Sequence, residues 1–300
     1  MSEFIDNLIN SICKSMYQGL WDSADFYFNK MNGILLNGME QSKDILTQTP
    51  SEWNSAAYSF IKITVSNAVI PIAACFLTFI FALQMINMVK ESNQLHNVKP
   101  QNMILVLITL AICLTICARS FEIVNGLFEI SKWATTHMPG GLSLTSGTLS
   151  SIPIPRETPT DKYNFGDVFT MLGNVLVTVI AEMFTYILVA AIYIRVNIWY
   201  LELLMYMAAS PMPFSTFLHK EWGQVGTNYL RKMLAIAFEG FYMLLAFGLY
   251  QAIAGRALTG FADTADTYLL SMVSTIGSGV ALLLVINKSG NISASVFNAH

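Results

Sequence analysis

The longest apolar stretch of the 300-residue chain covers residues 165–217 and reads FGDVFTMLGNVLVTVIAEMFTYILVAAIYIRVNIWYLELLMYMAASPMPFSTF. After Asp167 near its start, three charged side chains interrupt it: Glu182, Arg195 and Glu202. A helix needs only about 20 apolar residues to cross roughly 30 Å of hydrocarbon, so the stretch is too long for one crossing. Either it crosses twice, with a tight reversal near Arg195, or it crosses once and then runs along or re-enters the membrane until Pro211 and Pro213 end it.

Further apolar runs lie on both sides of this stretch, at residues 64–89, 103–128, 233–254 and 267–286. Hydrophobic residues make up 54% of the chain and charged residues 12%, whereas a soluble domain carries about 25% charged residues. We therefore expect an all-α fold, a polytopic transmembrane helical bundle of about five or six spans. The distribution of Lys and Arg between the loops does not fix the orientation of the termini.

The segments around the apolar runs divide the chain into four parts. Residues 1–48 carry two apolar stripes at helical spacing and predict an amphipathic helical N-terminal arm. Its apolar faces are expected to lie in the membrane interface or to pack on a partner, a neighbouring subunit or the rest of this chain. Residues 49–130 hold the first two transmembrane helices, and residues 131–164, rich in Pro, Gly, Ser and Thr, predict an exposed loop. Residues 165–300 hold the remaining helices and a short tail.

A helix-start signal precedes the first apolar run. Thr49 occupies an expected N-cap position, Pro50 the first helical position, and Glu52 completes a capping box. We expect the helix that starts here to continue through Trp53 into the first span, with a kink at Pro71.

Six charged residues fall at expected membrane depth: Arg119, Glu122, Glu182, Arg195, Glu202 and Glu239. A charge in hydrocarbon costs a few kcal/mol or more, so these side chains should face the bundle interior. Arg119 and Glu122 are spaced to pair within one helix, and Arg195 lies two turns from Glu202. The glutamates have two alternative roles: they line a polar pathway or bind a cation, or they pin helices or subunits together.

Several classes of function lack the residues that they need. The net charge of −3 and the absence of a basic run disfavour a nucleic-acid-binding surface. The four histidines and four cysteines show no metal-ligand spacing, and no phosphate loop, nucleophile elbow or zinc-protease pattern appears. We therefore predict no catalytic residue, no cofactor and no metal site.

Several local strings carry a resemblance to a known family. They are Thr49-Pro50-Ser51-Glu52-Trp53-Asn54, Val69-Ile70-Pro71-Ile72-Ala73, Asn93-Gln94-Leu95-His96, Ser210-Pro211-Met212-Pro213, Lys220-Glu221-Trp222-Gly223-Gln224, Asn228-Tyr229-Leu230-Arg231 and Phe297-Asn298-Ala299-His300. In these strings the chain resembles the TrbL-like polytopic membrane subunit of type IV secretion systems, in the form found on conjugative elements of Gram-positive bacteria. The resemblance covers most of the chain, whereas residues 1–45 and the Pro-rich loop match only in general character.

The resemblance implies a non-enzymatic channel or scaffold component of a conjugative DNA transfer machine in the bacterial cytoplasmic membrane. Its implied partners are the assembly ATPases, the coupling protein, other channel subunits and membrane lipids, with transported DNA contacted only transiently. A DNA-sized pore would need several copies, so we expect a homo-oligomer.

The resemblance also singles out a motif after the longest apolar stretch. Its residues are Pro211, Pro213, Glu221, Trp222 and Gly223. They are expected to form a rigid element at the membrane edge that serves in interactions, with Trp222 in the aromatic belt. The alternative is a kinked helix end with an ordinary interfacial tryptophan.

Two other functions compete with this interpretation. The first is an ion channel or secondary transporter, in which Glu182 and Glu239 would bind an ion near the segment broken by Pro211 and Pro213. The second is an intramembrane enzyme, which would need Glu182 and Glu239 to be adjacent.

Overall fold

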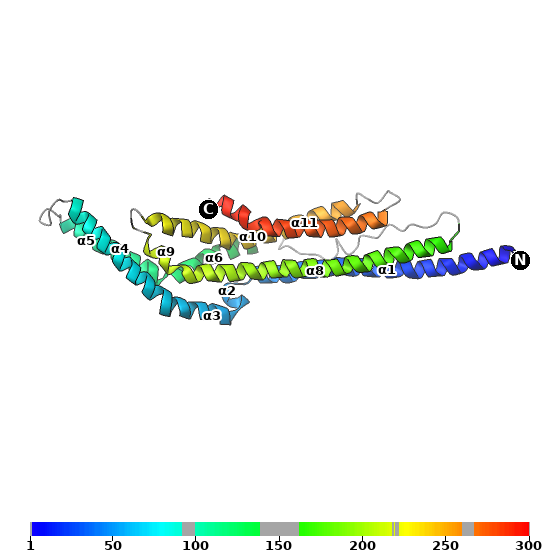
Figure 1. Cartoon of the computed structure of the whole chain (residues 1–300), viewed down its shortest axis with the longest axis horizontal. Coiled ribbons are helices and arrows are strands. Elements are labelled where there is room, and N and C mark those ends of the chain that lie inside the picture. Colours follow the sequence, from blue (N-terminus) through cyan, green and yellow to red (C-terminus); the bar gives the residue numbers. More distant parts are fainter. Residues whose placement is uncertain are drawn as a thin grey trace. The chain divides into compact units, whose positions relative to one another are not determined.

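The computed structural model describes residues 2–91, 100–138, 162–217, 219, 222–259 and 267–299, and within these ranges it contains helices and no strand. The helices are α1 (Ser2–Leu46), α2 (Pro50–Trp53), α3 (Ser55–Thr64), the π-helical turn η1 (Val65–Val69), α4 (Ile70–Glu91), α5 (Pro100–Ala118), α6 (Ser120–Thr136), α8 (Phe165–Ala209), α9 (Pro211–Ser215), α10 (Gly223–Thr259) and α11 (Thr267–Val296). They follow one another along the coloured chain in Figure 1. The expected all-α class is confirmed.

The N-terminal arm is one helix, α1, in which the two apolar stripes are continuous. The chain then begins a new helix at the predicted signal, because the Thr49 hydroxyl accepts the Glu52 N–H and the Glu52 carboxylate accepts the Thr49 N–H. The predicted capping box is confirmed. The helix nevertheless ends at Trp53, since Asn54 is extended and its side chain caps α3 by accepting the Ala57 N–H at 2.9 Å. One helix running into the first span was the wrong expectation.

Pro71 is preceded by a widened turn. In η1 the N–H of Ile70 donates to the carbonyl of Val65, five residues earlier. Pro71 has no N–H to continue the regular ladder, and π-helical turns are one of the usual ways in which a helix accommodates such a break. The expected distortion at Pro71 therefore takes the form of a π-helical turn.

The second apolar run is bent rather than straight. α5 ends at Ala118 and α6 starts at Ser120, and the two helices meet at an angle of 62°. Arg119 lies at this break with φ −103° and ψ 11°. α6 continues to Thr136, so the helix extends into the segment expected to be a loop. Residues 139–161 of that loop lie outside the described residues.

The longest apolar stretch forms one helix through Arg195. α8 runs without interruption from Phe165 to Ala209, and with α9 it makes a candidate span of 51 residues, Phe165–Ser215. At 1.5 Å per residue this is about 75 Å, more than twice the hydrocarbon thickness. The arrangement with a reversal at Arg195 is therefore not the observed one, and the helical run ends at the two prolines.

Four helices are long and apolar enough to cross a membrane: Ser55–Lys90, Phe165–Ser215, Gly223–Gln251 and Met272–Val296. The bent pair Met103–Ala118 and Ser120–Thr136 makes a fifth if it counts as one span. The chain is thus a multi-pass membrane protein with four or five candidate spans among its described residues, and a sixth is not found there.

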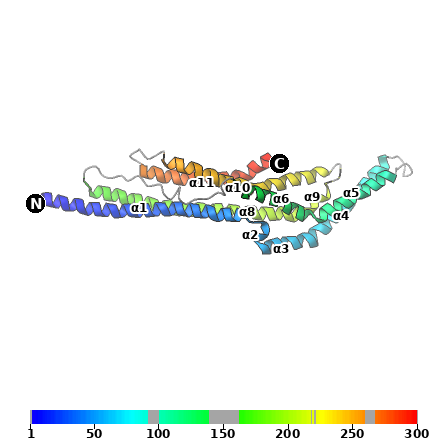
Figure 2. The same cartoon turned by 180° about the vertical axis from the view of Figure 1, so that it is seen from behind.

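The chain divides into two compact units. The first unit comprises Met1–Asp44, Pro139–Arg195 and Met243–Asn287, and the second comprises Ile45–Met138, Val196–Tyr242 and Lys288–His300. In the first unit, α1 and α8 lie side by side in both views (Figures 1 and 2). With Met272 of α11, they form a core that contains Cys13, Tyr17, Trp21, Ala24, Phe28, Met31, Val168, Met171 and Ala181. In the second unit, α4, α5 and α9 pack on one another, and large aromatic side chains such as Trp199, Tyr200 and Phe128 are almost fully buried.

Candidate functional site

The first unit supplies a cation to one of the predicted buried glutamates. Glu182 on α8 is 5% exposed, and one of its carboxylate oxygens lies 2.7 Å from the ammonium nitrogen of Lys30 on α1. Accepting this hydrogen bond, the Glu182 carboxylate raises the pKa of Lys30 above its ordinary value of 10.5. The Lys30 ammonium also lies 6.0 Å from the centroid of the Tyr27 ring on its own helix. Glu182 is therefore a paired carboxylate.

The contacts between α1 and the chain around α8 keep a nearly constant spacing in sequence. Asn10 Oδ1 accepts the N–H of Tyr163, 153 residues later, and Lys30 pairs with Glu182, 152 residues later. A Cβ added at Gly38 would clash with a methyl of Val189, 151 residues later. A constant offset means that the two helices run in the same direction. The arm thus packs on its own chain over much of its length.

The second predicted buried glutamate lies in the second unit. Glu239 on α10 is 3% exposed, and the Ser289 hydroxyl of α11 donates to its Oε1 at 3.4 Å. A Cβ added at Gly290 would lie 2.9 Å from the same oxygen. The Glu239 carboxylate therefore occupies space that is open only because Gly290 has no side chain. Glu182 and Glu239 belong to different compact units and do not form an acid pair within either of them.

Next to Glu239, three neighbouring helices donate hydrogen bonds to consecutive carbonyls of α10. The Ser293 hydroxyl of α11 donates to Ala235 at 2.6 Å, and the Trp199 indole of α8 donates to Ile236 at 2.7 Å. The Ser131 hydroxyl of α6 donates to Ala237 at 2.6 Å. All three donors are buried. Because such bonds hold helices together where water is absent, this turn of α10 connects α6, α8 and α11 within the second unit. We call it the carbonyl hub.

The other predicted charges take different positions. Arg119 and Glu122 are exposed, and no ion pair joins them among the residues that the structure describes. The expectation that they pair within one helix fails because Arg119 precedes α6 at the bend instead of lying inside it. Arg195 and Glu202 are half-buried on α8. Glu182 and Glu239 are thus buried among the helices, whereas Arg119 and Glu122 are not.

The segment from Thr49 to Trp53 connects several elements of the second unit. The Glu52 carboxylate accepts from the Lys132 ammonium of α6 at 3.1 Å. Together with the hydrogen bonds from Thr49, this pair lowers the pKa of Glu52 from 4.5 to about 2. The Trp53 ring stacks on Tyr200, with centroids 4.8 Å apart and an interplanar angle of 4°. The Tyr200 hydroxyl in turn donates to carbonyls at the end of α1 and just beyond it.

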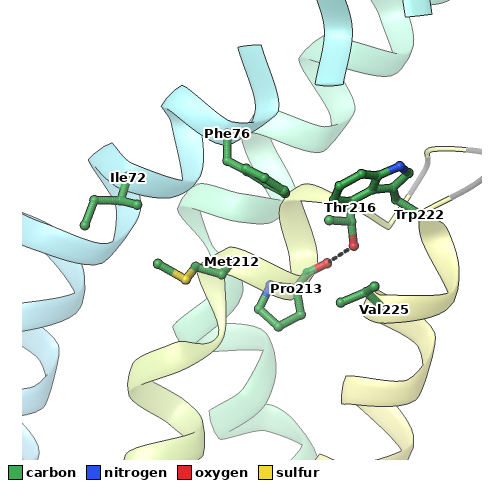
Figure 3. Close-up of a pocket in the computed structure, with 7 residues that line it drawn as sticks. All are labelled: Ile72, Phe76, Met212, Pro213, Thr216, Trp222 and Val225. Atoms are coloured by element: carbon green, nitrogen blue, oxygen red, sulfur yellow. Dashed lines mark hydrogen bonds between the residues drawn. The ribbon is translucent and has the colours of Figure 1, made fainter. Parts of the chain in front are cut away.

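The predicted proline and tryptophan motif surrounds an apolar pocket in the second unit (Figure 3). The pocket has a volume of about 280 Å³ and is lined by Ile72, Phe76, Met212, Pro213, Thr216, Trp222 and Val225. The Trp222 ring also contacts Phe76 of α4, with centroids 5.7 Å apart. Pro213 and Trp222 therefore line the same pocket. Pro211 is buried and does not line the pocket, and Glu221 lies outside the described residues.

Two glycines bring the start of α10 close to the proline segment. A Cβ at Gly223 would lie 3.0 Å from the carbonyl oxygen of Phe217, and a Cβ at Gly226 would lie 2.8 Å from that of Pro213. Backbone at this distance cannot give way as a flexible side chain does. Gly223 thus has a packing reason for its place in the motif.

Comparison with known protein families identifies the family of this chain. A scan against models of protein families matched residues 36–211 to the family described as TrbL/VirB6 plasmid conjugal transfer like protein. The match covers more than half of the chain and includes α2 to α6 and the whole of α8. The chain belongs to this family. A search of curated proteins and a search of solved structures each gave no match.

As a TrbL/VirB6-like protein, the chain is a membrane component of the type IV secretion and conjugation apparatus, and it associates with other subunits of that apparatus. The match ends at Pro211, so α10 and the carbonyl hub acceptors lie beyond it. The expected resemblance to a TrbL-like subunit is confirmed.

The residues that complete these sites in the TrbL/VirB6-like chain were not predicted from the sequence. They are Lys30, which pairs with Glu182, Lys132, which pairs with Glu52, and the donor Ser131. Each missing partner lies far away in sequence from the residue it contacts, so no local spacing marks it. One signal was present, because a carboxylate buried in a membrane helix requires a cation or hydrogen-bond donors from elsewhere.

Proposed function

We propose that the chain is a non-enzymatic channel or scaffold component of a conjugative DNA transfer machine in the bacterial cytoplasmic membrane. Its partners there are the assembly ATPases, the coupling protein and other channel subunits. The observation that carries the proposal is that the buried polar groups bond to one another between helices. Lys30 neutralises Glu182 within the first unit, and the carbonyl hub joins four helices within the second, so these groups hold the helices of each unit together.

The same observation separates this proposal from the ion channel or transporter. A transport carboxylate has to be available to its ion, whereas Glu182 is 5% exposed and bound to Lys30 at 2.7 Å. The described part of the chain also brings together no group of three or more potential metal ligands. The pairing therefore favours a structural role for Glu182.

The test is conjugation frequency of the parent mobile element after in-frame deletion of the gene. Complementing strains carry the wild type or the variants Glu182→Gln, Arg195→Gln and Trp222→Ala, with Lys14→Met on the exposed face of α1 as the matched control. Immunoblots of the membrane fraction correct for the amount of inserted protein. We expect deletion to abolish transfer and the wild type and Lys14→Met to restore it. Unchanged transfer after deletion would overturn the proposal and favour the transporter.

We also infer that several copies assemble in the membrane. The first four turns of α1 present apolar side chains that this chain leaves exposed: Phe4, Ile5, Leu8, Ile9, Ile12 and Met16. A contiguous apolar helix face of this kind typically meets another protein surface or the lipid. Pairs of Leu8→Cys chains should therefore cross-link in cells, whereas Asn7→Cys, one residue away on the helix, serves as the control. Monomers alone, both in cross-linked cells and after purification, would contradict assembly.

A further inference from the structure

The apolar pocket of the second unit is built from three segments that are distant in sequence. Ile72 and Phe76 come from α4 and Met212 and Pro213 from α9, whereas Val225 lies in the first turn of α10 and Trp222 directly before it. Thr216 follows α9. In Figure 3 these side chains surround a common space between the three ribbons. Several of them stay accessible from outside, since Ile72 is 54% exposed and Val225 51% exposed. The pocket is therefore open to whatever surrounds the helices.

The lining leaves almost nothing for a polar ligand to bind. Six of the seven lining side chains are hydrocarbon, thioether or aromatic, and the hydroxyl of Thr216 donates to the carbonyl of Pro213 at 2.8 Å. The indole nitrogen of Trp222 points away from Pro213 and Val225 in Figure 3. An apolar cavity without free hydrogen-bonding groups does not hold ordered water. A peptide backbone would leave its N–H and C=O groups without partners there.

The pocket lies among helices that are long and apolar enough to cross a membrane. Its three segments belong to the candidate spans Ser55–Lys90, Phe165–Ser215 and Gly223–Gln251. Residues 216–222 connect the last two, so the pocket lies where the chain leaves one span and enters the next. Tryptophan is enriched at that level of a membrane, with its ring in the hydrocarbon and its N–H toward the headgroups. The opening therefore lies on the surface of candidate membrane spans, beside a tryptophan.

From these observations we propose that the pocket binds one acyl chain of a membrane phospholipid, with the headgroup on the Trp222 side. The volume of about 280 Å³ is slightly below the roughly 300–1,000 Å³ of pockets that enclose drug-sized ligands. It suits part of one hydrocarbon chain and not a whole lipid. The bound chain joins α4 to the starts of α9 and α10, so it completes the packing that the protein leaves open between them. This inference is independent of the proposed role in DNA transfer.

The first experiment uses the full chain in vesicles that contain a phosphatidylcholine with a photoactivatable diazirine on one acyl chain. After irradiation, mass spectrometry locates the labelled peptides. We expect peptides with Phe76, Met212 and Val225 to be labelled several-fold more than Phe60 and Ile63, which are exposed apolar side chains of α3. Equal labelling of pocket and α3 residues would overturn the proposal, because it is the result expected for bulk lipid alone.

Two variants separate pocket filling from a general effect on the helix. Val225→Trp places a large ring in the pocket, whereas Leu249→Trp adds the same ring at a 54% exposed position of α10 that does not line the pocket. We expect Val225→Trp to reduce labelling of Phe76 and Met212 to the α3 level and Leu249→Trp to leave it unchanged. Unchanged labelling in Val225→Trp would contradict the proposal.

A measurement on the wild-type protein covers the case in which Val225→Trp does not fold. Phospholipids brominated on an acyl chain quench nearby tryptophans, and the contribution of Trp222 is the difference between the wild type and Trp222→Phe. We expect Trp222 to be quenched more strongly by this lipid than Trp133, a 63% exposed tryptophan of α6, obtained in the same way from Trp133→Phe. Weaker quenching of Trp222 than of Trp133 would overturn the proposal.

Discussion

The ammonium of Lys30 and a carboxylate oxygen of Glu182 lie 2.7 Å apart, although 152 residues separate them in sequence. The carboxylate is almost fully enclosed, while 44% of the lysine side chain remains exposed. The amphipathic helix α1 thus delivers the counter-charge to a membrane helix. Removing the lysine would leave a negative charge buried without its partner.

Lys30→Met should lower the stability of the protein, because it leaves the buried Glu182 carboxylate without its counter-charge. Lys30→Met combined with Glu182→Gln should recover part of the loss, because the uncompensated charge is then absent. Denaturant titration in detergent micelles measures both, with Lys14→Met as the control. Equal effects of Lys30→Met and Lys14→Met would show that the pair contributes nothing.

Gly290→Ala should displace the buried carboxylate of Glu239, because the added methyl would lie 2.9 Å from its Oε1. Overpacking of this kind costs about 1–3 kcal/mol. The control is Gly277→Ala on the same helix, where an added Cβ meets nothing within 4 Å. Thermal unfolding of the two variants in the same micelles compares them. If both variants unfold at the same temperature, the open space at Gly290 is not needed to accommodate the Glu239 carboxylate.

Gly240→Ala should loosen the carbonyl hub. Its added Cβ would lie 2.7 Å from the ring of Trp199, a rigid and almost fully buried side chain that donates to Ile236. We expect a loss of about 1–3 kcal/mol, whereas Gly126→Ala on α6 has open space and should gain up to about 1 kcal/mol of helix propensity. Hydrogen exchange of α10 amides detects the loosening directly. Unchanged exchange in Gly240→Ala would contradict the hub.

The charge of Glu52 should stabilise the second unit in a pH-dependent way. Its pKa falls from 4.5 to about 2 in the folded chain, so the carboxylate contributes stability above about pH 4.5 that is lost as the pH falls toward 2. Glu52→Gln keeps the capping hydrogen bonds and removes the charge.

The wild type should therefore unfold at a higher temperature than Glu52→Gln at pH 7, and the difference should shrink between pH 4.5 and pH 2. Glu129→Gln, at an exposed position of α6, is the matched control. A difference that stays constant over this range would show that ionisation of Glu52 is not the cause.

The sequence allowed the helical class and most spans to be predicted, because apolar runs of span length carry that information locally. The capping box at Thr49 was also predictable, since its residues lie within four positions. The end of that helix at Asn54 was not predictable, because Asn54 competes as a cap for the next helix. The bend at Arg119 was missed because Arg119 and Glu122 were expected to be charges inside one span, and a charge in an apolar run does not by itself reveal a change of direction.

The site was predictable only as single residues. Glu182 and Glu239 stand out because charges in apolar runs are costly, and the motif of Pro213 and Trp222 does meet at one pocket. The partners of these residues are set by how distant helices pack. Lys30 resembles any other lysine on the polar face of an amphipathic helix until α8 is placed beside it.

The parallel arrangement of α1 and α8 has a consequence for how the protein is made. α1 leaves the ribosome about 150 residues before the segment against which it packs. At roughly 5–20 residues per second, this delay is about 8–30 s. During that interval the apolar face with Tyr17, Trp21 and Phe28 is exposed, and so is the lysine that Glu182 will bind. The N-terminal helix is therefore made before its packing partner, and this apolar face has no α8 to cover it until the later segment has been synthesised.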